Sequence, residues 1–205
     1  MIELYVSTLI TFFVVIDPPG CAPIYAGLSS GASSTQRRAM AFRAVGVASG
    51  ILFVFALFGE TLLKGLGISL SSFRIAGGIM LFLIALEMVF ERRTQRREDR
   101  AAKVAHDHVE DVSIFPMAMP MIAGPGSIAS AMLLMSRNDG WERQGVVLAA
   151  MATILVLTLI ALLAAGAMMR VLGTKIEAVI TRLLGVLLAA LAVQFVVDGV
   201  SEVLR

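Results

Sequence analysis

Long apolar segments follow one another along this chain and are separated by shorter polar stretches. An α-helix needs about 20 predominantly apolar residues to cross the hydrocarbon core of a bilayer, and these segments are of that order. The pattern therefore predicts an all-α integral membrane protein. The six expected transmembrane helices are 2–25, 40–62, 69–90, 114–135, 145–169 and 178–201.

Glycine and proline interrupt two of these segments at corresponding places. The first segment is interrupted at Asp17–Gly20 and the fourth at Gly124–Gly126, about 107 residues further along a chain of 205. Proline removes a backbone donor and blocks the helical hydrogen-bond ladder. Paired interruptions of this kind indicate a binding site between the repeats of a membrane transporter. We therefore expect helices 1 and 4 to be broken at these motifs.

The two halves resemble each other beyond the interruptions. Leu66–Gly67 and Arg74–Gly77 precede an apolar segment in the first half, and Leu172–Gly173 and Arg182–Gly185 do so in the second. A repeat of three spans is odd-numbered, so its second copy must enter the membrane from the opposite side. The sequence thus predicts two inverted three-helix repeats. Their expected bounds are 1–91 and 113–205, with a polar linker over 92–112.

The composition excludes a water-soluble domain. The chain is 58% hydrophobic and 16% charged, and its mean hydropathy is +0.88, far from the average of soluble proteins. The first segment lacks a basic region before it, so it reads as a mature span and not as a cleaved signal. Cys21 is the single cysteine, which excludes an internal disulfide.

The distribution of lysine and arginine predicts the orientation. With the six spans above, twelve of these residues fall on the side of the linker and five on the side of the termini. Positively charged loops stay in the cytoplasm. We therefore expect a cytoplasmic linker and both termini outside.

Asp17 is the ionisable residue that lies deepest in an apolar segment. A charge at the bilayer centre costs roughly 2.5–3.5 kcal/mol on insertion scales, so such a residue faces a protein interior or a water-filled cavity. Two roles remain open. Asp17 can cap the helix that resumes at Pro18, or it can bind an ammonium group or a coupling proton.

The second interruption contains no ionisable residue. Free N–H groups at a helix N-terminus inside a membrane attract an anion such as a carboxylate. The alternative is a simple kink with tight packing. Because two interruptions occur at repeat-related positions, we predict a small site lined largely by backbone. Its residues are Asp17, Pro18, Pro19, Gly20, Gly124, Pro125, Gly126 and Ser127.

Glu87, near the linker-side end of the third span, is a second candidate for proton coupling beside Asp17; pairing with Arg92 or Arg93 is its other role. His106 and His108 have no ordered ligand spacing around them, and we expect no metal and no cofactor. The chain carries no phosphate-binding loop and no hydrolase motif, so we expect no enzyme. Nothing beyond the arginines of the linker indicates nucleic-acid binding.

Both interruptions and their flanks resemble the MarC family of bacterial inner-membrane proteins. The resemblance rests on Phe12–Ile24 and Pro116–Ile128 and extends to the length, the six spans and the linker. Cys21 stands where the family often has asparagine. The family is similar to the LysE-type exporters, and some of its members are described as transporters of small neutral amino acids such as alanine and glycine. The resemblance therefore implies a secondary transporter.

These observations together predict a multi-pass transporter of the bacterial inner membrane. Its expected partners are a small neutral amino acid and the lipid bilayer, and the spacing of Gly46 and Gly50 also suits a homo-oligomer. Two alternatives remain: an exporter or channel for another small solute, and a membrane scaffold that transports nothing.

Overall fold

The fold is known from a computed structural model that describes residues 1–90, 92, 111–167 and 173–204. The described part of the chain is helical and contains no strand. Five of its helices are long and apolar enough to cross a membrane, and the count rises to six when the bent pair near residue 123 is taken as one span. The predicted all-α membrane class is thereby confirmed.

The helices follow the predicted spans closely. Those of the first half are α1 (Ile2–Ile16), α2 (Pro18–Leu28), α3 (Ser34–Gly65) and α4 (Leu70–Val89). Those of the second half are the π-helical segment η1 (Ser113–Ile122), α6 (Pro125–Arg137), α7 (Trp141–Leu163) and α9 (Gly173–Val203). The expected linker over 92–112, with His106 and His108, lies almost wholly outside the described residues.

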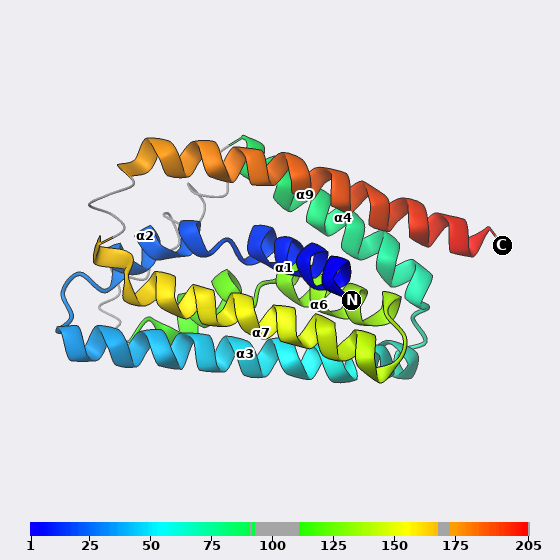
Figure 1. Cartoon of the computed structure of the whole chain (residues 1–205), viewed down its shortest axis with the longest axis horizontal. Coiled ribbons are helices and arrows are strands. Elements are labelled where there is room, and N and C mark those ends of the chain that lie inside the picture. The colour runs from blue at the N-terminus through cyan, green and yellow to red at the C-terminus, as the bar shows by residue number, and fades with distance from the viewer. Residues whose placement is uncertain (91, 93–110, 168–172, 205) are drawn as a thin grey trace.

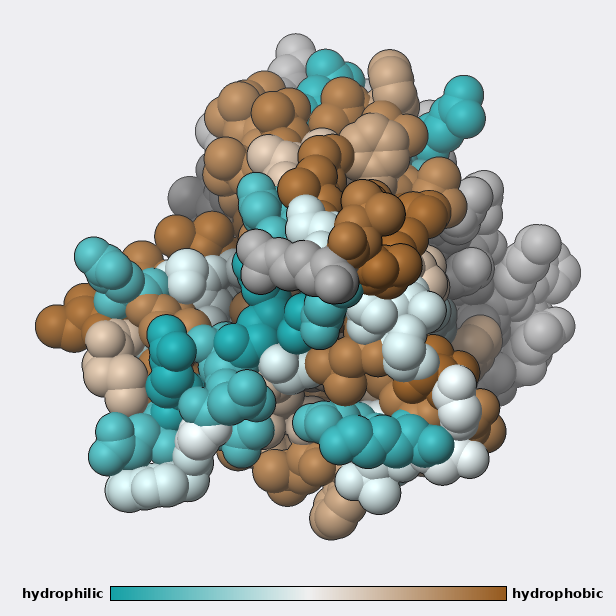
Figure 2. Space-filling model, turned by 90° about the vertical axis from the view of Figure 1, so that its right-hand side faces the viewer, coloured by the Kyte–Doolittle hydropathy of each residue, from teal (hydrophilic) through white to brown (hydrophobic). Residues whose placement is uncertain are grey.

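Both termini lie at the same end of the bundle (Figure 1). We call this the terminus end; the α3–α4 and α6–α7 connections lie there too. The opposite, linker end holds the α2–α3 connection and the start of η1. Figure 2 looks at the terminus end, where hydrophilic residues gather, with hydrophobic side chains around them. A polar end beside apolar flanks suits a bundle that meets water there and lipid along its sides.

Serine caps set the starts of two long helices. The Ser33 hydroxyl accepts a hydrogen bond from the Gln36 N–H at 3.3 Å, and the Gln36 side chain accepts one from the Ser33 N–H at 2.9 Å. This reciprocal pair is a capping box. Ser69 caps α4 through the Ser72 N–H at 3.1 Å. The capping box explains why α3 begins at Ser34, before the predicted span at residue 40.

Helices α4 and α9 form a closely packed pair at one side of the bundle (Figure 1). Glycine makes the close approach possible on both helices. A Cβ atom added to Gly78 would lie 2.8 Å from the Ala192 carbonyl oxygen, and one added to Gly185 would lie 3.1 Å from the Ala85 carbonyl oxygen. Small residues at helix contacts are typical of membrane bundles.

Candidate functional site

The first interruption separates α1 from α2 at a single residue. Asp17 adopts the left-handed conformation, with φ 59° and ψ 65°, and its side chain is 2% exposed. Its carboxylate accepts a hydrogen bond from the Gly20 N–H at 3.2 Å. Pro18 and Pro19, which have no N–H to satisfy, form the first turn of α2. Asp17 therefore fills the capping role that its position predicts.

The second interruption is longer and is not capped. The backbone of η1 leaves the helical region at Phe115 and Met119, each directly before a proline, as proline requires of its predecessor. Gly124 is the N-cap of α6 and offers no side-chain hydrogen bond to the first turn. Helices η1 and α6 meet at an angle that departs from straight by 51°.

A cavity of about 610 Å³ opens beside this second interruption, between η1, α4 and the start of α6. It therefore joins Glu87 to the four predicted residues from Gly124 to Ser127. The cavity is lined by Val15, Met80, Leu83, Ile84, Glu87, Phe115, Met119, Pro120, Met121, Gly124, Pro125, Gly126 and Ser127.

The residues of the first interruption do not line this cavity. Asp17, Pro18, Pro19 and Gly20 are absent from its walls within the described chain. Val15 on α1 marks the nearest approach that we identify, because a Cβ on Gly126 would lie 3.3 Å from its Cγ1 atom. The structure thus brings together half of the predicted site and Glu87, and leaves the other half outside the cavity, with Pro19 partly exposed and the rest buried.

The walls of the cavity are mainly apolar. Met80, Met119 and Met121 contribute flexible, polarisable side chains, and Glu87 and Ser127 contribute polar groups. The first turn of α6 adds backbone N–H groups at the positive end of a helix dipole. This chamber is roomier than the backbone-lined site expected from the sequence, because side chains of α4 and η1 stand apart around it.

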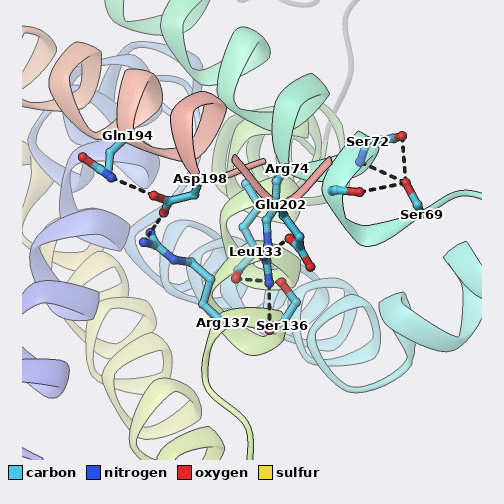
Figure 3. Close-up of polar contacts among 10 residues, drawn as sticks. Ser69, Ser72, Arg74, Leu133, Ser136, Arg137, Gln194, Asp198 and Glu202 are labelled. Atoms are coloured by element: carbon cyan, nitrogen blue, oxygen red, sulfur yellow. Dashed lines mark hydrogen bonds and ion pairs between the residues drawn. The ribbon is translucent and has the colours of Figure 1, made fainter. Parts of the chain in front are cut away.

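Ion pairs tie three helices together at the terminus end, as Figure 3 shows. Arg137 of α6 pairs with Asp198 of α9, and Arg74 of α4 pairs with Glu202 of α9. We call these four residues the terminus-end clasp. Gln194 donates a hydrogen bond to Asp198 within α9 at 2.7 Å.

Further contacts reinforce the clasp. Arg74 also donates to the Ser136 carbonyl oxygen at 3.3 Å (Figure 3). The Arg137 guanidinium lies 5.1 Å from the centre of the Phe195 ring, within cation–π range. The sequence did not reveal this network, since its charges are distant along the chain. The one local signal was the spacing of Asp198 and Glu202, which places both on one face of α9.

An ion pair at the linker end joins α3 to the chain before η1. Arg43 of α3 pairs with Asp111, which directly precedes η1. Asp111 also accepts a hydrogen bond from the Ser113 N–H at 2.9 Å. Hydrogen bonding to Ser113, followed by the charge and hydrogen bond of Arg43, lowers the pKa of Asp111 from its ordinary value of 3.8, against an opposing effect of burial.

Comparison with known proteins identifies relatives along the whole chain. A family model described as "MarC family integral membrane protein" matches residues 2–204. A UPF0056 membrane protein of Methanocaldococcus jannaschii is 32% identical over 203 residues, which cover 99% of this chain and 98% of the relative. The UPF0056 membrane protein YvbG of Bacillus subtilis is 32% identical, with 98% and 96% covered. No solved structure matches the chain.

Proposed function

We propose that this chain, which belongs to the MarC family of integral membrane proteins, is a secondary transporter of small neutral amino acids such as alanine or glycine. The proposal includes coupling to a proton or another ion, a place in the bacterial inner membrane, a cytoplasmic linker and termini outside. It assigns no catalytic residue and no cofactor.

One observation carries the proposal: the uncapped N-terminus of α6 opens onto a cavity that also contains a carboxylate. The N–H groups of Gly126 and Ser127 belong to the first turn of α6, where an anion is stabilised. Glu87 lines the same cavity and suits an ammonium group. A zwitterion presents both charges on one small molecule, so this pair of features fits an amino acid.

We further propose that the halves are inverted three-helix repeats. An offset of 107 residues relates α1 to η1, α2 to α6, α3 to α7 and α4 to α9. The packing supports this relation, because α1 packs on α7 as η1 packs on α3, and α2 packs on α7 as α6 packs on α3. Helices α3 and α7 run in opposite directions, and so do α4 and α9 (Figure 1).

The contact between α4 and α9 supports the same offset at single residues. Gly78 approaches Ala192, and Ala85 approaches Gly185. The offset of 107 residues relates Gly78 to Gly185 and Ala85 to Ala192. This reciprocal pairing is what a pseudo-two-fold axis would produce, and such an axis is the symmetry of inverted-repeat transporters.

A second candidate function is the export or channelling of another small solute. The cavity volume of about 610 Å³ favours it, since this volume falls in the range that holds drug-sized ligands. The methionine-rich walls would adapt to varied apolar groups. Competition by larger apolar amines in the assay below separates this candidate from an amino-acid transporter.

The test is uptake of labelled alanine and glycine into proteoliposomes, with and without an imposed proton gradient. We expect gradient-sensitive uptake that Gly126→Val abolishes, because a Cβ at this position already lies 2.6 Å from the Ile84 Cδ1 atom. Gly145→Val is the matched control, since no atom of the residues that the structure describes lies within 4 Å of its added Cβ. Equal uptake by both variants would refute the assigned site.

Asp17→Asn tests coupling in the same assay. Asparagine is as good a helix cap as aspartate and tolerates the left-handed conformation, so the fold should survive. We expect gradient-driven uptake to be lost. Glu87→Gln tests the other candidate. A variant that keeps full gradient sensitivity removes its residue from the coupling mechanism.

A further inference from the structure

Residues related by the 107-residue offset differ sharply in exposure around the cavity. Phe115 and Met119 of η1 line it and are 54% and 43% exposed. Their equivalents on α1 are Thr8 and Phe12, and both are fully buried. The bundle is therefore open at η1 and closed at the equivalent place on α1.

The helix contacts differ in the same way. Helix α1 packs on α9. The equivalent helices, η1 and α4, stand on either side of the cavity and form no comparable packed pair within the described chain. One of the two equivalent helix pairs is packed and the other is separated. If η1 and α4 packed together while α1 and α9 separated, the bundle would contain the same kinds of contact on the opposite side. Equivalent repeats therefore allow two related arrangements.

The terminus-end clasp lies on the closed side. Asp198 and Glu202 hold α9 to α6 and α4 there, and Gln194, the repeat equivalent of Glu87, donates to Asp198. Thr8, on the helix that α9 covers, has a buried hydroxyl with no hydrogen-bond partner among the described residues. Leaving a buried polar group unpaired costs free energy. The Thr8 hydroxyl carries this cost while α9 covers it, and water would relieve the cost in a state where the hydroxyl is exposed.

We propose that the chain forms a second binding cavity at the terminus side, in a state where α9 withdraws from α1 and α4 closes on η1. The 107-residue offset maps the lining of the present cavity onto that of the second. It assigns to the second cavity Thr8, Phe12, Asp17, Pro18, Leu187 and Gln194. This inference rests on the inverted repeats proposed above.

The second cavity gives the first interruption a role. Asp17 is buried and outside the present cavity, whereas its equivalent Gly124 lines that cavity. In the second state Asp17 faces the terminus side and takes the ammonium group of the same amino-acid solute. The two interruptions thus serve one solute from opposite sides of the membrane.

Thiol labelling tests the second cavity without any solute. In a Cys21→Ala background, single cysteines are placed by Thr8→Cys and Met119→Cys, and a membrane-impermeant maleimide is added to one side of vesicles oriented by a C-terminal tag. Thr158→Cys is the matched control, since Thr158 is a fully buried threonine of α7 outside both cavities. A state populated at about 1% suffices for reaction, so we expect Thr8→Cys to react from the terminus side at least about tenfold faster than the control.

A clasp variant supplies the second arm. Asp198→Asn should speed labelling of Thr8→Cys roughly fivefold and slow that of Met119→Cys, since the exchange of states links the two sites. Glu60→Gln is the control, because its partner Lys64 lies on the same helix, α3, at the same end. Labelling of Thr8→Cys at the rate of the Thr158→Cys control, or parallel rises at both reporter sites, would overturn the second cavity.

Added alanine separates this inference from the proposed function. Measured uptake with an unreactive Thr8→Cys would overturn the second cavity and leave the amino-acid transporter standing. Reactive Thr8→Cys whose labelling alanine does not change would support the second cavity and count against alanine as its ligand.

Discussion

The two interruptions occupy corresponding places in the chain, but only the first has a side chain that caps the helix after it. Both put proline at the start of a helix inside an apolar region, at Pro18 and at Pro125. The first supplies its own anion, because the Asp17 carboxylate accepts from the first turn of α2. The second has only Gly124 at that position and faces a cavity.

The difference lies in where each helix start finds its hydrogen-bond acceptor. A helix N-terminus in a membrane needs an acceptor for its free N–H groups. Where the chain provides that acceptor, as Asp17 does, a side chain satisfies part of the first turn. Where the chain withholds it, the carboxylate of a solute can take its place. Changes that alter either interruption therefore test this contrast directly.

The largest effect is expected at Gly124. A Cβ on this residue would lie 2.3 Å from the Pro120 carbonyl oxygen, which belongs to the backbone and cannot rotate away. Gly124→Ala should therefore distort the second interruption, lower the stability by about 1–3 kcal/mol, and abolish uptake. Thermal unfolding in detergent and the proteoliposome assay measure the two effects.

Gly145→Ala on α7 is the control for Gly124→Ala, because no atom of the described chain lies within 4 Å of its added Cβ. Alanine in a helix interior is favoured over glycine, so this control should be neutral or slightly stabilising. If both variants unfold at the same temperature and transport equally well, the tight contact at Gly124 has no consequence and the contrast between the interruptions fails.

A smaller effect is expected at Gly20. A Cβ here would lie 2.3 Å from the Asp17 Oδ2 atom, which is the end of a side chain and can move. Gly20→Ala should turn the carboxylate away and lose the cap, at a cost of about 0.5–2 kcal/mol. Gly27→Ala on the same helix has open space around it and serves as the control.

A double-mutant cycle sharpens this test. Asp17→Gly keeps the left-handed backbone at φ 59° and removes the carboxylate. In that background Gly20→Ala should cost nothing, since the group it displaces is gone. Equal costs of Gly20→Ala in both backgrounds would mean that the cap does not explain the glycine.

Much of this architecture followed from hydropathy. The described helices match the expected spans, since twenty apolar residues have few alternatives to a membrane helix. The capping role of Asp17 also followed from the aspartate before Pro18 and Pro19, because capping is local. The choice of which interruption opens onto the cavity did not, because it depends on how far α4 lies from η1.

The terminus-end clasp was also beyond sequence reasoning. Its partners, Arg74 with Glu202 and Arg137 with Asp198, are more than sixty residues apart and meet only in the folded bundle. The proposed equivalence of Gly78 and Gly185 was not visible either, since the sequence motif aligns Gly77 with Gly185. Their shared packing role became visible only with Ala192 and Ala85 opposite them.

The smallest effect is expected at the linker end, where Arg43 and Asp111 anchor the start of η1 to α3 and so fix one side of the open interruption. The folded protein lowers the pKa of Asp111 below 3.8. The charged Asp111, held by its hydrogen bonds with Ser113 and then by Arg43, therefore stabilises the fold above the unfolded pKa and loses this contribution as the pH falls through the folded pKa. Because both side chains are substantially exposed, we expect about 1 kcal/mol or less, measured as the difference in thermal unfolding between the wild type and Asp111→Asn. That difference should be constant at neutral pH, shrink as the pH falls below 3.8 and vanish below the folded pKa. A difference that persists there would mean that the charge of Asp111 is not what stabilises the linker end.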